Sequence, residues 1–126
     1  FPIANELCDI LKQSFPFNRP CVDLVEAIVR THRLTSSGTA SAHSANMAAI
    51  ATVMFCQLGR WGWLWVGAAL LTGLSRIYVG VHYPTQVLFG WMCGILVGLA
   101  VFHIFGAVAR YRLNRLAEPP DEKPEV

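Results

Sequence analysis

Three long apolar runs follow one another along the chain, and each is bounded by polar or turn-forming residues. The runs cover residues 45–58, 61–81 and 87–109, and the last contains 23 residues without a formally charged side chain. A helix needs about 20 apolar residues to cross a bilayer. The third run reaches this length by itself, and the first two reach it when their polar ends are included. The pattern predicts three membrane-spanning helices, with a tight turn at Gly59-Arg60 between the first two.

A soluble all-helical core is the alternative explanation, because buried helices can also be apolar on every side. A soluble domain of 126 residues, however, has little interior in which to hide three such runs. The composition agrees with this objection, since 54% of the residues are hydrophobic and only 14% are charged. We therefore expect an all-α integral membrane bundle with about three spanning helices, preceded by short N-terminal helices.

The first 40 residues are mixed in character and predict short helices. Asn5 is placed to cap a helix that runs to about Lys12, and Pro16 and Pro20 interrupt the chain after it. Residues 22–34 have apolar side chains at helical spacing, which predicts a short amphipathic helix. A loop of small residues follows and leads into the first apolar run.

The two ends of the chain differ from its centre. The sequence begins with Phe1 rather than Met and shows no signal-peptide pattern, so we expect a fragment or a processed form. Residues 118–126 are acidic and Pro-rich and are expected to be disordered, which leaves residues 1–117 as the domain. Cys8 and Cys21 lie in the polar N-terminal region and could pair if that side faces an oxidising compartment.

Two further patterns suit helices in a membrane. Glycine recurs at every fourth position of the third run, at Gly90, Gly94 and Gly98, which gives one helix face a groove for close packing. Three tryptophans within residues 61–65 follow Arg60, where an aromatic belt at a membrane surface is expected.

The charged residues fall into two groups if the three runs cross a membrane in turn. One surface carries Lys12, Arg19, His43, Arg76 and His82, together with Arg30 and Arg33. The other carries Arg60, Arg110, Arg112 and Arg115. An arginine cluster beside a span normally stays in the cytoplasm, so the first surface is expected to face the periplasm or the exterior. The net charge of +2 is too small to argue for a nucleic-acid partner.

Three short motifs lie at helix ends on that first surface. They are Lys12-x6-Arg19-Pro20, Ser41-Ala42-His43, and Ser75-Arg76-x5-His82 followed by Pro84 and Gln86. Guanidinium groups match phosphate oxygens in pairs, and an ammonium adds a further positive charge. Unpaired N–H groups at a helix start also attract anions, and a charge inside the end of an apolar helix is a functional candidate. Together the motifs predict a phosphate-binding site.

The two histidines of these motifs add reactive groups to the site. One histidine can attack phosphorus while the other protonates the leaving oxygen. Pro84 suits the first turn of the third helix, because its missing N–H needs no partner there. This places His82 just before the helix and Gln86 about one turn after its start, within reach of the imidazole. His32 and His103 have no such partners and predict no role.

Each motif alone is weak, but their joint occurrence in this order resembles the type 2 phosphatidic acid phosphatase (PAP2) superfamily. That family includes integral membrane lipid phosphatases, and soluble acid phosphatases and vanadium haloperoxidases share its site. The stretch at residues 75–84 is similar to bacterial members that act on undecaprenyl diphosphate. The resemblance covers residues 12–86. Membrane members usually have about six spanning helices, so it also implies that helices preceding the first motif are absent here.

The resemblance implies a role for each motif residue. His82 would be the nucleophile that forms a phosphohistidine, and His43 would be the general acid for the leaving group. The phosphoryl oxygens would be held by Lys12, Arg19, Arg76, Ser41 and the backbone N–H of Ala42. No metal and no cofactor are implied, since the cationic side chains neutralise the developing charge. The implied partners are a lipid phosphate and the bilayer, in a bacterial inner membrane.

Three positions depart from the family pattern. Ala40 and Ala42 replace the Pro and Gly of Pro-Ser-Gly-His, and Gln86 replaces the Asp that orients the nucleophilic histidine. Glutamine accepts a hydrogen bond through its amide oxygen but carries no charge. Loss of the orienting carboxylate in a serine-protease triad lowers the rate about 10⁴-fold. Either activity is reduced, or Asp23 or Glu26 supplies the carboxylate, or the chain binds without turnover.

The predicted function is therefore a phosphatase for a polyprenyl diphosphate or a phospholipid-type phosphate, with Gln86 included among its catalytic groups. One alternative is a lipid phosphotransferase that uses the same phosphohistidine. The other is a weakly active or non-catalytic membrane protein that binds lipid phosphates, which the residue at position 86 favours.

Overall fold

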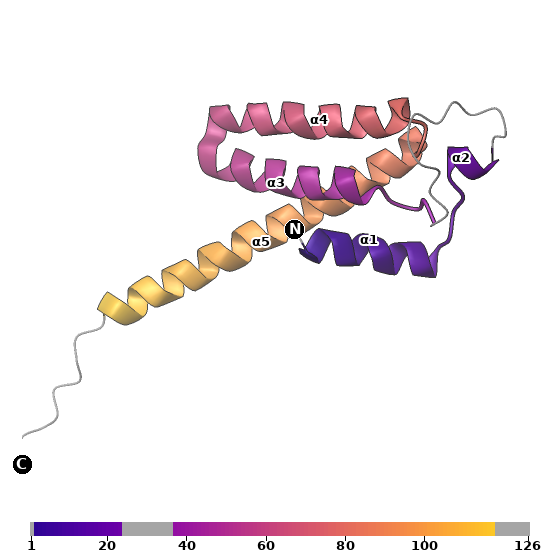
Figure 1. The fold of residues 1–126 in the computed structure, drawn as a ribbon. Helices are drawn as coiled ribbons and strands as arrows, with labels where there is room; N and C mark the ends of the chain where they lie inside the picture. The colour runs from indigo at the N-terminus through magenta and orange to yellow at the C-terminus, as the bar shows by residue number, and fades with distance from the viewer. Residues whose placement is uncertain (1, 24–36, 118–126) are drawn as a thin grey trace, which may run out of the picture.

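The computed structural model describes residues 2–23 and 37–117, and the chain forms helices joined by short connections in these segments (Figure 1). The helices are α1 (Pro2–Ser14), α2 (Pro20–Asp23), α3 (Ala42–Leu58), α4 (Trp63–Tyr78) and α5 (Pro84–Ala117), and a 3-10 turn, η1 (Gly59–Gly62), joins α3 to α4. No strand occurs within the described segments, so the all-α prediction is confirmed. The helix expected at residues 22–34 lies outside them except for its first two residues, and so does the tail at 118–126.

Helix α3 is the centre of the fold. It packs against α4, α5 and α1, and α1 also contacts α5. Helix α4 runs back along α3, and α5 crosses both at an angle (Figure 1). As a result, the first residues of α3 and α5 and the last residues of α1 and α4 meet at one end of the molecule (Figure 1). The three sequence motifs lie at this end.

The ends of α3 are set by local chemistry. Ser41 precedes the helix in an extended conformation, and its side-chain oxygen accepts a hydrogen bond from the Ser44 N–H. Gly59 ends the helix with a positive φ of 54°, which glycine adopts without steric cost, and its N–H donates to the Phe55 carbonyl. Gly62 packs so close to the Phe55 backbone that a side chain would not fit there. The tight turn predicted at Gly59-Arg60 is therefore confirmed.

Helix α1 corrects one expectation. Asn5 does not cap it, because the helix begins at Pro2, whose fixed φ suits a first turn, and Asn5 donates instead to Asp9 within the helix at 3.3 Å. Cys8 is a free and fully buried thiol, and its possible pairing with Cys21 concerns a side chain outside the described residues.

The glycine repeat brings α5 into close contact with α3. A Cβ atom added to Gly90 would lie 2.6 Å from the Ser41 carbonyl oxygen. A Cβ atom added to Gly98 would lie 2.8 Å from the Ala49 carbonyl oxygen, and Gly94 lies as close to the α3 backbone between them. All three glycines are buried. The predicted groove for close helix packing is confirmed, and it faces α3.

Helix α5 begins at Pro84 as predicted but continues to Ala117, so it includes the arginine cluster that was expected to follow the span. Within the described part of the chain, it is the one helix long and apolar enough to cross a membrane, with a mean hydropathy of 2.2 over its most apolar window. Helices α3 and α4 have 17 and 16 residues. At a rise of 1.5 Å per residue they are about 25 Å long, shorter than a hydrocarbon core of about 30 Å.

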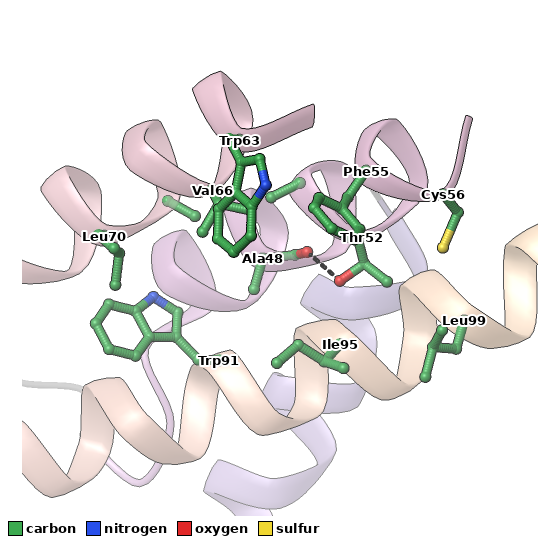
Figure 2. Close-up of a pocket in the computed structure, with 12 residues that line it drawn as sticks. Ala48, Thr52, Phe55, Cys56, Trp63, Val66, Leu70, Trp91, Ile95 and Leu99 are labelled. Atoms are coloured by element: carbon green, nitrogen blue, oxygen red, sulfur yellow. Dashed lines mark hydrogen bonds between the residues drawn. The ribbon is translucent and has the colours of Figure 1, made fainter. Parts of the chain in front are cut away.

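Apolar side chains cover much of the surface away from the motifs. A groove of about 540 Å³ lies between α3, α4 and α5. Figure 2 shows Phe55, Trp63 and Trp91 around this groove, where the hydrogen bond drawn runs from the Thr52 hydroxyl to the Ala48 carbonyl. None of the predicted site residues lines it. The three tryptophans of residues 61–65 are exposed at the end of the turn and the start of α4, and Trp63 also lines the groove.

Candidate functional site

The connection between α4 and α5 places His82 at the centre of the site. The chain leaves α4 at Tyr78 and turns through Gly80, which has a positive φ of 79°. The Val81 N–H then donates back to the Arg76 carbonyl at 3.3 Å. This bond holds the chain just before His82, and the N–H groups of Gln86 and Val87 donate to the Tyr83 carbonyl just after it. Residues 79–83 therefore form a compact loop that holds His82 in place before α5.

The imidazole of His82 is buried and has a defined partner at each nitrogen. Its Nε2 atom lies 3.1 Å from Nη1 of Arg19, and its Nδ1 atom lies 3.1 Å from Oε1 of Gln86. Because a guanidinium group can only donate, Nε2 must be the acceptor in the first contact. The proton therefore sits on Nδ1 and is donated to the amide oxygen of Gln86. This tautomer leaves the Nε2 lone pair directed toward the guanidinium group.

The side chain of Gln86 is itself held by two backbone groups. Its Oε1 atom accepts a second hydrogen bond from the Tyr83 N–H at 3.1 Å, and its Nε2 atom donates to the Asn18 carbonyl at 2.8 Å. The second bond defines which end of the amide is nitrogen, so the oxygen must face His82. Gln86 is only 6% exposed.

Arg19 and Gly38 complete the wall behind the imidazole. Arg19 is buried and donates to the Val81 and Ser37 carbonyl oxygens, each at 3.2 Å, in addition to its contact with His82. A Cβ atom added to Gly38 would lie 2.6 Å from Cγ of Arg19 and 2.9 Å from Nε2 of Gln86. Glycine at position 38 therefore lets the loop lie directly against both side chains.

The surroundings of His82 favour its neutral form. Burial lowers the pKa of His82 to about 4, and the positive charge of Arg19 acts in the same direction. The hydrogen bond to Gln86 opposes this shift in part, and the more distant charge of Lys12 adds to it. At neutral pH the Nε2 atom of His82 is thus an unprotonated nitrogen, as a nucleophile must be.

Three other motif residues lie at the same end of the molecule as His82. Lys12 forms an ion pair of 2.7 Å with Asp9 and remains partly exposed. The Nε atom of Arg76 is buried and has no hydrogen-bond partner among the described residues. His43 is exposed in the first turn of α3, and the charges of Arg76, Lys12 and Arg19 all act on it. The cationic side chains therefore converge on His43 and His82.

The start of α3 connects this helix to α5 and also presents a backbone N–H without a partner inside the helix. Ser41 is fully buried, and its Oγ atom accepts hydrogen bonds from both the N–H and the hydroxyl of Ser44. Its own N–H donates to the Gln86 carbonyl at 3.1 Å, which ties α3 to α5. Ala42 stands at the first position of α3, where the N–H has no partner inside the helix. Contact of Ser41 or Ala42 with phosphate stays a prediction.

The sequence did not reveal the backbone groups that hold the site. Nearly every residue has a backbone carbonyl and N–H, so residue types do not indicate which of them take part. The Asn18 carbonyl and the Tyr83 N–H belong to this class. Gly38 was visible only as part of a small-residue loop. Glu26 and the side chain of Asp23 lie outside the described part of the molecule, and within that part no carboxylate is hydrogen-bonded to His82. Nor does any group of three His, Cys, Asp or Glu side chains there have a geometry for binding a metal ion.

An apolar cavity lies next to this polar cluster. It has a volume of about 580 Å³ and is lined by Gln86 and Tyr83 on the site side. Most of the remaining lining is apolar and comes from α1, the segment after it and α5: Leu11, Phe15, Phe17 and Phe89. A hydrophobic cavity thus lies directly beside the cluster that contains Arg19, His82 and Gln86.

Comparison with known proteins identifies bacterial and archaeal relatives. Undecaprenyl-diphosphatase BcrC of Bacillus subtilis is 40% identical over 62 residues, which are 49% of this chain and 32% of that protein. The bacitracin transport permease protein BcrC of Bacillus licheniformis is 41% identical over 59 residues, 40% of this chain and 29% of the relative. An undecaprenyl-diphosphatase of Sulfolobus acidocaldarius is 30% identical over 95 residues, 75% of this chain and 46% of the relative. The chain thus spans less than half the length of each.

No solved structure matches this chain. A family model described as the PAP2 superfamily matches residues 3–110, a range that contains all three motifs and nearly every described helix. Since this match covers most of the sequence, the chain belongs to the PAP2 superfamily.

Proposed function

We propose that this chain is the catalytic part of a membrane phosphatase that removes phosphate from a lipid diphosphate or monophosphate through a phosphohistidine on His82. The observation that carries the proposal is the state of the imidazole. Its Nδ1 proton is given to Gln86, and its unprotonated Nε2 atom lies 3.1 Å from the Arg19 guanidinium, where a phosphoryl oxygen would also be attracted.

In the first step, Nε2 of His82 attacks phosphorus. A bond forms between nitrogen and phosphorus as the bond from phosphorus to the bridging oxygen breaks, and His43 donates a proton to that oxygen. The lipid leaves with one phosphate fewer. In the second step, water attacks the phosphohistidine while His43 takes its proton. The nitrogen–phosphorus bond breaks, and orthophosphate is released.

The cationic side chains would hold the phosphoryl oxygens throughout. Arg19, Arg76 and Lys12 provide three positive charges that act on His43. The buried Arg76 Nε atom is a donor without a partner among the described residues, as a group awaiting an anion would be. Such prearranged donors stabilise the charge that develops in the transition state.

A lipid substrate is supported by two observations. The apolar cavity beside Gln86 and Tyr83 has room for part of a hydrocarbon chain next to the polar cluster around His82. Two of the three relatives compared above are named as undecaprenyl-diphosphatases. A polyprenyl diphosphate is therefore the leading substrate class.

We further propose that α3, α4 and α5 all cross a bacterial inner membrane and that the site faces the periplasm or exterior. Helices α3 and α4 would reach the required length together with the polar residues at their ends. Exposed apolar side chains on α4 and α5, such as Leu71 and Phe105, would then face lipid. The site and the arginine cluster lie at opposite ends of α5, which suits opposite surfaces (Figure 1).

The proposal is tested by measuring phosphate release from undecaprenyl diphosphate and phosphatidic acid with the protein in detergent. His82→Ala should abolish release. His103→Ala is the matched control, because His103 is exposed on α5 far along the chain from the motifs and contacts Phe102 rather than a site residue. Turnover that survives His82→Ala would rule out the mechanism.

The same assay separates the alternatives. A lipid phosphotransferase would label an added acceptor lipid from a radioactive donor while releasing little orthophosphate. A protein that only binds lipid phosphates would retain the donor without either product.

A further inference from the structure

Gln86 occupies a position where every polar atom of its side chain has a role. Its amide oxygen accepts from His82 Nδ1 and from the Tyr83 N–H, both at 3.1 Å. Its amide nitrogen donates to the Asn18 carbonyl at 2.8 Å. Gly38 packs against the same amide, so the group has little room to turn. The site thus requires an acceptor on one side of this group and a donor on the other.

A carboxylate meets only half of this requirement. It accepts on both oxygens and has no hydrogen to donate. If glutamate replaced Gln86 with the same geometry, one carboxylate oxygen would face the Asn18 carbonyl oxygen at 2.8 Å with no proton between them. Two acceptor oxygens at this distance repel each other, and the hydrogen bond of this part-buried contact is lost. The backbone at Asn18 therefore selects an amide over an acid.

We infer that Gln86 is a positioning residue for His82 and that this site is built for a neutral amide at position 86, not as a weakened form of a carboxylate site. The inference rests on the proposed function, because it assigns Gln86 the task of orienting the nucleophile of that reaction. Gln86 acts through the imidazole and is not required to touch the substrate.

The charges around His82 make the neutral partner chemically reasonable. Arg19 touches the imidazole directly, and Lys12 acts on it from α1. Among the described residues, Arg76 on α4 also carries a charge that acts on His43, the titratable motif residue on α3. Because Arg19 faces Nε2, this nitrogen stays unprotonated and the imidazole stays neutral. A carboxylate at position 86 would raise the pKa of the imidazole, so the Nε2 lone pair would be lost at a higher pH than with the neutral amide.

Gln86→Glu and Gln86→Met separate these effects. Glutamate keeps the length but replaces the donor with an acceptor, whereas methionine keeps the length and removes the polar atoms. Asp would be less informative, since it is shorter and withdraws from the Asn18 carbonyl. Gln13→Glu is the matched control, because Gln13 is exposed near the end of α1 and receives the same change of charge.

Two quantities are measured on each variant: the pH profile of kcat/KM and the imidazole tautomer of His82 by nitrogen NMR. Gln86→Glu should lower kcat/KM at pH 7 at least tenfold and move the acid limb of the profile to higher pH. Gln86→Met should lower kcat with little change in KM and should weaken the preference for the proton on Nδ1, which Arg19 at Nε2 still favours. Gln13→Glu should change neither quantity.

The inference is overturned if Gln86→Glu matches or exceeds the unsubstituted protein with an unchanged acid limb, or if Gln86→Met leaves both kcat and the tautomer ratio unchanged. Either result leaves the proposed phosphatase standing. If the unsubstituted protein releases no phosphate, the proposed function fails instead, while the tautomer measurement still shows whether Gln86 positions His82.

Discussion

At the scale of single residues, the main feature is a buried histidine held by neutral and cationic partners. Arg19 donates to Nε2 of His82, and Gln86 accepts from its Nδ1. Backbone carbonyl groups accept hydrogen bonds from both partners and so orient them. The arrangement fixes the tautomer of the imidazole through hydrogen bonds alone. A nucleophile of this kind should differ from a histidine paired with a carboxylate chiefly in its response to pH.

The first prediction concerns that response. Burial and Arg19 lower the pKa of His82 from its ordinary value of 6.5 to about 4, so the neutral form persists as the pH falls through 6.5 and is lost only near 4. The acid limb of kcat/KM reports groups of the free enzyme, and it should therefore have its midpoint near pH 4. NMR titration of the His82 ring should give the same midpoint. A midpoint near 6.5 in both measurements would contradict the arrangement of charges described here.

The second prediction concerns Gly38. Gly38→Ala places a methyl group within 2.6 Å of Arg19 and 2.9 Å of Gln86, so both partners of His82 must move. Displacements of about 1 Å can lower activity on the order of 100-fold, and we expect a loss of 10- to 100-fold in kcat. Gly67→Ala is the control, since nothing lies within 4 Å of its added Cβ. Equal activity of the two variants would mean that the wall behind the imidazole is not needed.

At the scale of helices, the sequence predicted most of the elements but not all of their ends. The three apolar runs became α3, α4 and α5, and Gly59 and Pro84 marked boundaries correctly because their backbone preferences are local. Asn5 was misassigned as a cap, since a proline three residues earlier starts the helix. The site could be predicted as a set of side chains. Its backbone contacts from Asn18 and Tyr83 could not, because they depend on how distant segments pack.

The third prediction tests the contact between α3 and α5. Gly94→Ala drives a methyl group into the α3 backbone at Ala45 and should destabilise the fold by about 1–3 kcal/mol, as overpacking does. Gly106→Ala is the matched control on the same helix, where nothing lies within 4 Å. It should be neutral or stabilising by up to about 1 kcal/mol, because alanine favours a helix more than glycine does. Unfolding in detergent measures both, and equal stabilities would argue against the close packing.

At the scale of the whole molecule, the chain has a polar end and a basic end separated by apolar helices. The predicted site lies where α1 and α4 end and α3 and α5 begin, and the arginine cluster lies near the far end of α5 (Figure 1). From His103 to Ala117, α5 is exposed at every position. Such a length of apolar and then basic helix suits a span followed by a cytoplasmic segment.

The fourth prediction concerns this orientation. Single cysteines at Gln13 and Asn114, both exposed and at opposite ends of the molecule, can be introduced after replacing the native cysteines. In intact bacterial cells, a membrane-impermeant thiol reagent should label position 13. Position 114 should be labelled only after the membrane is opened. The reverse pattern would place the site in the cytoplasm.

The most direct test of the central claim is to trap the phosphoenzyme. The protein is mixed with a substrate labelled in its terminal phosphate, quenched within milliseconds to seconds, and digested to locate the label. We predict a phosphate bond that is stable in alkali and labile in acid, carried by the peptide that contains His82 and absent from His82→Ala, while His103→Ala retains it. Turnover at the normal rate with no label on His82, or in the His82→Ala variant, would contradict the account.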